Sequence, residues 1–379
     1  MKSKLYWWVI AAAFIGPGTV TTAARAGADH GFGLVWAVVV SILACMVLQE
    51  ASARVSIMTG KPLAVVMGEQ LGRWVMLIVA LAVGIGCLAY EAGNITGATA
   101  GIALLTGDAS KTIITLLISV LAAGVLWFGT LTRISQWLGL IVFIMGLCFL
   151  IAAVVIFDDI LQFVRGLIPA MPDGATLTVI ALIGTTIVPY ALFLGSGIAK
   201  GRQIPEMRQG ILWSVAVGGV ITMGILITGT AVEGGFTFQG LSDTLRTTNG
   251  VLFSHAFALG LFAAGFTSAV TAPTALGIVV ESIWPETPAL WIRIIKIGVV
   301  AVGAAVSLTG IQPIAIIVAA QALNGLLLPL TALTVALVLM KPALRAMPYG
   351  ESKVGFMVLW MSVALSFVLG FTALYRLFL

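Results

Sequence analysis

Charged residues are scarce in this sequence. Asp, Glu, Lys and Arg make up only 9% of its 379 residues, whereas a soluble domain carries about 25%. So few charges do not cover the surface of a water-soluble protein of this size, which excludes that class. Hydrophobic residues make up 60% of the chain, and the mean hydropathy is +1.16. The composition therefore predicts an all-α integral membrane protein.

Cysteine and histidine are also rare, with three and two residues. Cys45, Cys87 and Cys148 lie inside apolar runs without CxxC or metal-ligand spacing, which excludes a disulfide framework and a cysteine-based metal centre. The sequence also lacks a Gly-rich phosphate loop, an HExxH motif and a nucleophile elbow. We therefore predict neither an enzyme nor a bound cofactor.

The net charge of +5 does not indicate a nucleic-acid partner, because the basic residues are scattered between apolar runs. Their distribution indicates membrane orientation instead, since cytoplasmic loops are enriched in Lys and Arg. If the N-terminus is cytoplasmic, fourteen of the nineteen basic residues fall on the inner side. The other five are Arg25, Lys111, Arg165, Arg246 and Arg376. We predict a multi-pass protein of the inner (plasma) membrane with an external C-terminus.

Apolar runs of membrane-spanning length fill most of the chain. At about 20 residues for each helical span, the sequence holds about eleven spans and no sizeable soluble domain. The predicted spans are 5–29, 33–56, 74–104, 111–130, 135–156, 176–199, 209–232, 250–280, 290–309, 313–340 and 354–378. Residues 1–379 are thus expected to form one transmembrane domain whose partner is the lipid bilayer.

Two spans are interrupted by proline near their middle. The first contains Gly16-Pro17-Gly18-Thr19, and the sixth contains Thr185-Thr186-Ile187-Val188-Pro189-Tyr190. Each motif alone fits a simple kink, but proline and glycine can also break a span and free backbone groups at membrane depth. Breaks in spans 1 and 6 are typical of transporters with a 5+5 inverted repeat. We predict repeats at 1–156 and 176–340, with 354–378 as an extra helix.

Several motifs in this order resemble one transporter family. Gly16-Pro17-Gly18-Thr19 corresponds to an Asp-Pro-Gly-Asn motif, and Val188-Pro189-Tyr190 to Met-Pro-His. The stretch Gln49-Glu50-Ala51-Ser52-Ala53-Arg54 is similar to Gln-x-x-Ser-Ala-Arg. These are motifs of the natural resistance-associated macrophage protein (Nramp) family of divalent-metal transporters. The resemblance covers most of the chain and implies a leucine-transporter-like fold.

The departures from the family motifs concern its metal ligands. Gly16, Thr19 and Val188 replace the Asp, Asn and Met that hold metal in the family, and Tyr190 replaces the His. Because metal ions need anionic oxygen, imidazole or sulfur ligands, we expect no metal site of the family type. The preferred hypothesis is therefore uptake of a small anion such as bicarbonate. The alternative is a proton-coupled transporter of a divalent cation, Mn²⁺ or Mg²⁺, that uses backbone carbonyls and Gln321. A third reading is a sensor or scaffold that no longer transports.

The anion hypothesis relies on the helix ends at the two breaks, where unpaired N–H groups form a positive end. Arg25 would make the outer vestibule positive, or else contact lipid headgroups. The predicted substrate-binding residues are Gly16, Pro17, Gly18, Thr19, Thr185, Val188, Tyr190 and Gln321.

Polar residues in spans 3 and 8 are candidates for ion coupling. By the resemblance, Glu91 corresponds to an acidic position of the family's proton pathway, and Asn94 replaces a second acid; Glu91 could also serve packing alone. Thr267 and Ser268 match the hydroxyl pair that holds Na⁺ in related transporters, although membrane-buried hydroxyls usually bond their own helix. The coupling ion is thus H⁺ or Na⁺. A monomer is the expected oligomeric state.

Overall fold

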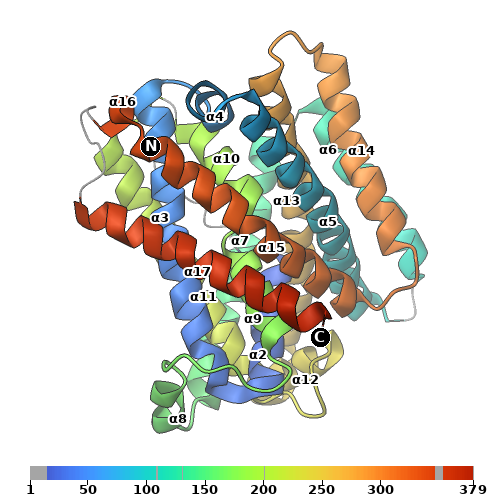
Figure 1. Ribbon diagram of the computed structural model, residues 1–379. Coiled ribbons are helices and arrows are strands. Elements are labelled where there is room, and N and C mark those ends of the chain that lie inside the picture. The colour runs from blue at the N-terminus through green and yellow to red at the C-terminus, as the bar shows by residue number, and fades with distance from the viewer. Residues whose placement is uncertain (1–14, 108–109, 130, 200, 346–352, 379) are drawn as a thin grey trace.

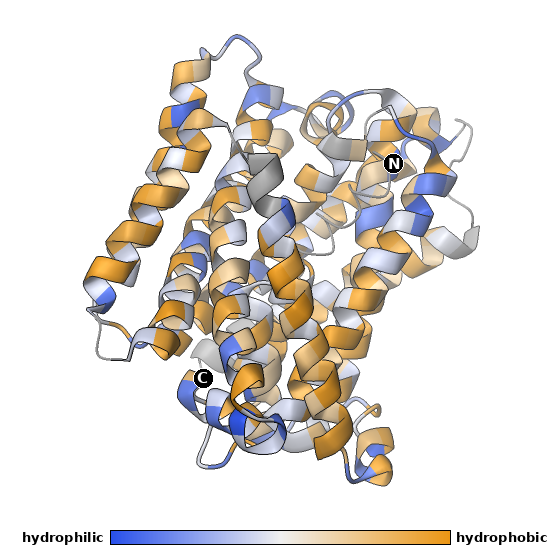
Figure 2. Ribbon diagram, turned by 180° about the vertical axis from the view of Figure 1, so that it is seen from behind, coloured by the Kyte–Doolittle hydropathy of each residue, from blue (hydrophilic) through white to orange (hydrophobic). Residues whose placement is uncertain are grey.

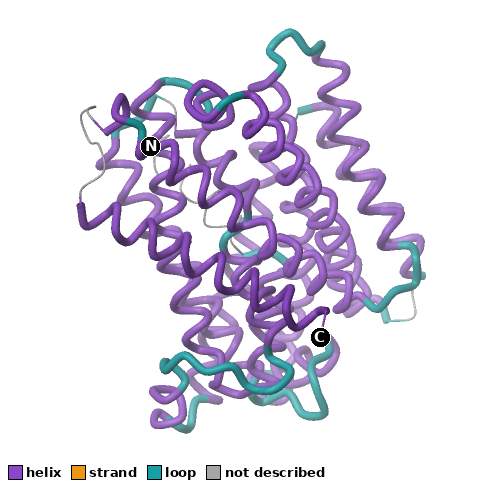
Figure 3. The backbone as a smooth tube through the Cα atoms, in the orientation of Figure 1, coloured by secondary structure: helices purple, strands orange, loops and turns teal. Residues whose placement is uncertain are grey.

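The computed structural model describes residues 15–107, 110–129, 131–199, 201–345 and 353–378. All regular elements in these ranges are helices, and no strand occurs among them (Figure 3). An apolar chain in a membrane satisfies its backbone N–H and C=O groups within each segment only by forming helices. The predicted all-α class is therefore confirmed.

The helices that make up the membrane spans agree closely with the predicted spans. They are α2 (Pro17–His30), α3 (Val35–Thr59), α5 (Arg73–Thr106), α6 (Lys111–Phe128), α7 (Leu131–Ile156), α9 (Thr176–Thr186), α10 (Pro189–Ala199), α11 (Ile204–Gly229), α13 (Val251–Ile283), α14 (Ala289–Ser307), α15 (Pro313–Met340) and α17 (Lys353–Phe378). Within the described ranges, ten segments are long and apolar enough to cross a membrane, and one of them, 17–59, contains both α2 and α3. When α2 and α3 are counted separately, these segments agree with the predicted number of about eleven spans.

Four short helices and a 3₁₀ turn were not predicted. They are α4 (Leu63–Leu71), α8 (Ile160–Arg165), α12 (Phe238–Asn249), α16 (Pro342–Arg345) and η1 (Gly31–Leu34). All are too short to cross a membrane, so a search for spans passes over them. Residues 5–14 of the first predicted span lie outside the described residues, and α2 is the part of that span after the proline.

The short helices mark the two ends of the bundle. In Figure 1, α4 and α16 lie at one end and α8 and α12 at the other. We call these the α4 end and the α12 end. Hydrophobic residues cover much of the long helices between them, as Figure 2 shows. Val120 of α6 and Val154 of α7, for example, are 69% and 80% exposed. Such apolar surfaces suit contact with lipid.

Helix α2 lies deep in the bundle because small residues let its neighbours approach. A side chain at Gly229 of α11 would collide with the backbone of Ala24, and one at Gly27 would collide with α11. On another side, a side chain at Gly97 of α5 would collide with the ring of Pro17. Small residues at helix contacts are a general device of membrane proteins. They place the start of α2 at the centre of the molecule.

Candidate functional site

The first break is the start of α2. Gly16 is the residue before the helix and has an extended backbone, with φ −95° and ψ 175°. Pro17 occupies the first turn, where its fixed φ suits a helix and its missing N–H is not needed. The N–H groups of Gly18 and Thr19 belong to the first turn, which has no intrahelical acceptors. The start of α2 therefore presents polar backbone inside the bundle.

The second break separates α9 from α10. Helix α9 ends at Thr186, Ile187 has φ −111° and ψ 79°, and α10 begins at Pro189. Two side chains of α3 contact this break. The Cys45 thiol donates to the Thr186 carbonyl at 3.3 Å, and the Ser41 hydroxyl donates to Thr186 Oγ1 at 3.2 Å. The predicted break of span 6 is present, and α3 supports it.

The two breaks meet beside α15. Thr19 Oγ1 lies 3.2 Å from Thr185 Oγ1. A side chain at Gly18 would collide with the amide of Gln321 and would lie 2.8 Å from Thr185 Oγ1. Gln321 is 1% exposed, and its Oε1 has no hydrogen-bond partner among the described residues. Three predicted residues, Thr19, Thr185 and Gln321, thus form a neutral, oxygen-rich group at the start of α2.

Aromatic and hydroxyl groups surround Gly16. A Cβ atom at this glycine would lie 3.1 Å from the Tyr90 hydroxyl and 3.4 Å from Ser268 Oγ. The rings of Tyr90 and Tyr190 pack edge to face, with centroids 5.3 Å apart. Val188, which completes the break, is also buried. Tyr90 was not predicted, although it directly precedes Glu91 in the sequence.

Glu91 and Asn94 are both buried in α5. Neither carboxyl oxygen of Glu91 has a hydrogen-bond partner among the described residues, and the same is true of Asn94 Nδ2. Glu91 packs against α14, where a Cβ at Gly303 would lie 2.6 Å from its Cγ. Arg54 and Glu91 are the only buried Lys, Arg, Asp or Glu residues in the described part of the chain. An ionisable group at this depth is a candidate for proton transfer.

The predicted hydroxyl pair of α13 is divided. Ser268 faces Gly16 at the first break. The Thr267 hydroxyl instead donates to the carbonyls of Ala263 and Ala264, at 2.8 and 3.1 Å, within its own helix. This is the usual behaviour of a buried hydroxyl in a membrane helix. A joint role for Thr267 and Ser268 in Na⁺ binding remains a prediction.

Arg25 lies about two turns beyond the break on α2. Its Nε donates to Asp29 Oδ2 at 3.0 Å, and the two side chains are 33% and 30% exposed. The carboxylate offsets much of the positive charge that we assigned to the outer vestibule. This pair, four residues apart on one helix, was readable from the sequence.

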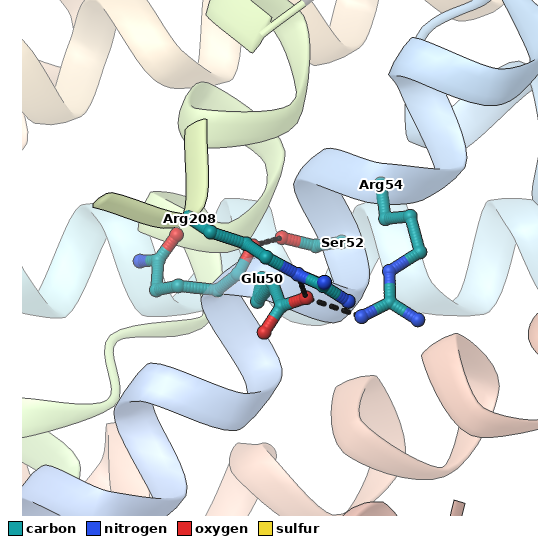
Figure 4. Close-up of polar contacts among 5 residues, drawn as sticks. Glu50, Ser52, Arg54 and Arg208 are labelled. Carbon is teal, nitrogen blue, oxygen red and sulfur yellow. Dashed lines mark hydrogen bonds and ion pairs between the residues drawn. The ribbon is translucent and has the colours of Figure 1, made fainter. Parts of the chain in front are cut away.

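A charged cluster lies on α3 near the α4 end. Figure 4 shows Glu50 between two guanidinium groups, and its Oε1 accepts from Arg54 Nη2 and from Arg208 Nε of α11. The Ser52 hydroxyl in the same view donates to the Gln49 carbonyl at 3.0 Å. Arg54 is 3% exposed. The cluster joins α3 to α11.

None of these groups is a conventional metal centre. Among the described residues, no cluster of three or more His, Cys, Asp or Glu side chains could hold a metal ion. The polar atoms around the two breaks are hydroxyl, amide and backbone groups instead. They are able to hold an ion only as neutral oxygen or nitrogen ligands.

The family model described as Natural resistance-associated macrophage protein-like (Nramp) matches residues 7–379. The chain belongs to the Nramp family. Two relatives are named Divalent metal cation transporter MntH. The protein from Acidiphilium cryptum is 26% identical over 352 residues, which cover 85% of this chain and 78% of the relative. The protein from Yersinia pestis is 28% identical over 313 residues, which cover 76% and 74%.

Solved structures confirm the fold. A manganese transporter mutant from Eremococcus coleocola has a TM-score of 0.79 and 19% identity, and the match covers 97% of this chain and 85% of that one. Mhp1, a nucleobase-cation-symport-1 family transporter, has a TM-score of 0.62 at 14% identity, with 98% and 90% covered. The leucine-transporter-like fold implied by the motifs is therefore correct.

The comparisons overturn the preferred hypothesis on the substrate. The relatives are named as divalent metal cation transporters, so uptake of a small anion such as bicarbonate is the wrong reading. That hypothesis counted only the side-chain ligands lost at Gly16, Thr19 and Val188. It gave too little weight to backbone carbonyls, hydroxyls, the Gln321 amide and water, all of which are ligands of hard cations. The comparisons favour the alternative, a divalent-metal transporter.

Proposed function

We propose that this protein is a secondary transporter of a divalent metal cation of the Mg²⁺ and Mn²⁺ class, driven in part by protons. Membership of the Nramp family and the names of its relatives support this proposal. The observation that carries it is the buried Gln321 amide, which lies against Gly18 beside the hydroxyl pair of Thr19 and Thr185 and whose Oε1 has no hydrogen-bond partner among the described residues. An unpaired buried acceptor costs about 1–3 kcal/mol, which a bound cation or its water shell would relieve.

The ligand chemistry favours hard cations. Carbonyl, carboxylate and water oxygens suit Mg²⁺, Ca²⁺ and Mn²⁺, whereas sulfur ligands select softer metals. Val188 offers no thioether at the second break, and the nearby Cys45 thiol is engaged with the Thr186 carbonyl. Mg²⁺ keeps several waters in most protein sites. We therefore expect a partly hydrated ion, bound weakly because no carboxylate offsets its charge.

The neutral site affects how transport is driven. A loaded site without a carboxylate carries both charges of the ion through the membrane field. Each charge contributes about 2.3 kcal/mol for every 100 mV of membrane potential. A divalent ion that moves to the negative side therefore gains about 4.6 kcal/mol at 100 mV. Uptake of a cation is thus favoured by the membrane potential itself.

Glu91 is the proposed proton carrier. It is fully buried, lacks a hydrogen-bond partner among the described residues, and lies next to Tyr90, whose hydroxyl faces Gly16. Asn94 is the polar group one turn further along α5. Coupling to Na⁺ remains the alternative, because Ser268 also faces Gly16. Imposed H⁺ and Na⁺ gradients distinguish the two.

The wider organisation is proposed on the same basis. Residues 1–156 and 176–340 form the two inverted repeats, and 354–378 form an extra helix. The protein resides in the inner (plasma) membrane with its N-terminus in the cytoplasm, which places the α4 end inside. It acts as a monomer with one site.

Uptake into proteoliposomes tests the proposed function. Mn²⁺ and Mg²⁺ uptake would be measured with imposed H⁺, Na⁺ and potential gradients for the wild type, for Gln321→Leu and for Gln209→Leu. Gln209 is an exposed residue of α11 and serves as the matched control. We expect saturable wild-type uptake, unchanged uptake with Gln209→Leu, and at least about a tenfold loss with Gln321→Leu. Folded wild-type protein that moves neither ion under any gradient would refute the proposal.

A further inference from the structure

Asn324 is a buried amide that the proposed ion site does not use. It lies on α15, three residues beyond Gln321, which is about 4.5 Å along the helix toward the α4 end. Its exposure is 0%, and neither Oδ1 nor Nδ2 has a hydrogen-bond partner among the described residues. The side chain therefore buries two donors and an acceptor that all lack partners.

The buried hydroxyl residues of α15 behave differently. The Thr331 hydroxyl donates to the Leu328 carbonyl at 3.0 Å, and the Thr334 hydroxyl donates to the Leu330 carbonyl at 3.0 Å. These hydroxyls are satisfied within their own helix. Buried amides also normally find partners. Asn324 is thus an exception that points to water or an ion as its partner.

The neighbouring helix leaves room for this amide. Gly86 of α5 faces it, and a Cβ at Gly86 would lie 2.9 Å from Asn324 Oδ1 and 3.6 Å from Leu327 Cδ1. Tyr90, one turn along α5, brings its hydroxyl to Gly16 at the first break. The α5 and α15 contact therefore runs from the two breaks to the Gly86 and Asn324 pair. Polar groups continue along it from Gln321 to Asn324.

We propose that Asn324 is a second binding position on the transport route, where the ion and its water shell are held after leaving Gln321 toward the α4 end. This inference rests on the proposed function for the identity of the ion. The Asn324 carbonyl would accept the ion or its water, and the NH₂ group would donate to a water of the same shell. Gly86 is a positioning residue, because it leaves space for the amide.

Cysteine accessibility tests the route without assuming which ion is carried. Asn324→Cys would be treated with a water-soluble methanethiosulfonate, and modification at position 324 would be read by peptide mass spectrometry. The wild type reports the background from its native thiols. Ala322→Cys is the matched control, since Ala322 is 7% exposed and packs with Ile180, Ala181 and Val318. We expect modification at 324 to be at least about tenfold faster than at 322.

The possible outcomes separate this inference from the proposed function. Slower modification at 324 with added Mg²⁺ or Mn²⁺ would support both. Fast modification that neither ion slows would support the route and contradict the divalent cargo. Modification at 324 no faster than at 322, in protein whose wild type transports Mn²⁺, would overturn the inference and leave the proposed function standing.

Transport kinetics provide a second test that a purely structural role would not satisfy. We expect Asn324→Leu to lower the maximal uptake rate about tenfold with little change in KM, because binding at Gln321 is intact. Asn324→Ser, which keeps a polar group, should restore part of the rate. Gly86→Ala should give a smaller loss of the same kind, because it displaces the amide. Equal losses with Asn324→Leu and Asn324→Ser, accompanied by equal losses of folded protein, would contradict the assignment.

Discussion

The charged cluster near the α4 end and the group around the two breaks use polar residues in opposite ways. In the first, one carboxylate, Glu50, is bonded by two guanidinium groups, Arg54 and Arg208. In the second, no charged side chain is among the groups that meet at the start of α2, and the Gln321 amide oxygen lacks a partner among the described residues. In the cluster the opposite charges are paired, whereas the centre has an amide oxygen that an ion could use.

The comparison distinguishes polar residues that stabilise a membrane protein from polar residues that can bind an ion. A charge near the end of a span is stabilised by an opposite charge and by water, and it joins helices. A neutral oxygen at the centre costs less to bury than a carboxylate, so it can remain unpaired until an ion arrives. The same distinction applies on α15: Asn324 has no partner among the described residues, whereas Thr331 and Thr334 bond their own helix.

Adding a carboxylate to the neutral centre should produce the largest change. Gly16→Asp places an acid near the Tyr90 hydroxyl, at the position where the family motif has Asp. Carboxylate oxygens are ligands that suit Mn²⁺, so we expect Mn²⁺ to bind at least about tenfold more tightly, which is about 1.4 kcal/mol. Isothermal titration in detergent measures this effect. Unchanged or weaker binding by the folded variant would show that the ion does not bind near Gly16.

Removing the carboxylate of the charged cluster should affect stability more than transport. Glu50→Leu leaves Arg54, which is 3% exposed, beside the second cation of Arg208. Glu50 itself is partly exposed, so we expect a loss of about 1–2 kcal/mol, less than for a fully buried pair. Thermal unfolding of purified protein should show a lower Tm, while the KM for Mn²⁺ stays the same. A large rise in KM without a change in Tm would place this cluster in the ion site.

Neutralising Glu91 should change coupling while leaving the fold intact. Glu91→Gln keeps the shape of the side chain but cannot exchange a proton. We expect uptake to lose most of its stimulation by an inward H⁺ gradient, a several-fold effect, while uptake driven by the membrane potential persists. Glu69→Gln, at an exposed residue paired with Lys61, is the control. Stimulation that survives in Glu91→Gln would exclude this residue as the proton carrier.

The exposed pair on α2 should matter least. Arg25→Gln breaks a partly exposed bond to Asp29, and such pairs contribute about 0–1 kcal/mol. We expect a shift in unfolding free energy below about 0.5 kcal/mol and less than a twofold change in Mn²⁺ uptake at physiological salt. A strong change in uptake that disappears at high salt would restore a role for Arg25 in the vestibule.

The sequence predicts much of the fold because the membrane leaves few alternatives. Runs of about 20 apolar residues form spans, so α15 was placed correctly. Pro17 and Pro189 each interrupt the hydrogen bonds of the span that contains them, so the two breaks were also placed correctly. The short helices α4, α8, α12 and α16 were missed because they do not cross the membrane. Gln321 was predicted as a neutral amide of the tenth span that could contribute to the site between the breaks. Asn324, three residues later on the same span, was missed.

Other parts of the site depend on contacts between distant segments. Nothing in the sequence places Tyr90 beside Gly16, Gly86 beside Asn324, or Cys45 at the second break, because these contacts arise only when α2, α3, α5 and α15 pack together. The substrate was misjudged for a related reason. Side-chain charge can be counted in a sequence, whereas the hydroxyl and amide groups that different helices bring together at the start of α2 cannot.

The sign of the transported charge is the measurement to make first. Proteoliposomes on a solid-supported membrane would be exposed to a step of Mg²⁺ or Mn²⁺, and the current would be recorded for the wild type and Gln321→Leu. We predict an inward positive current that saturates with ion concentration and falls at least about tenfold in Gln321→Leu. No current and no ion uptake by folded wild-type protein, or a current that Gln321→Leu leaves unchanged, would contradict transport of a divalent cation through this neutral site.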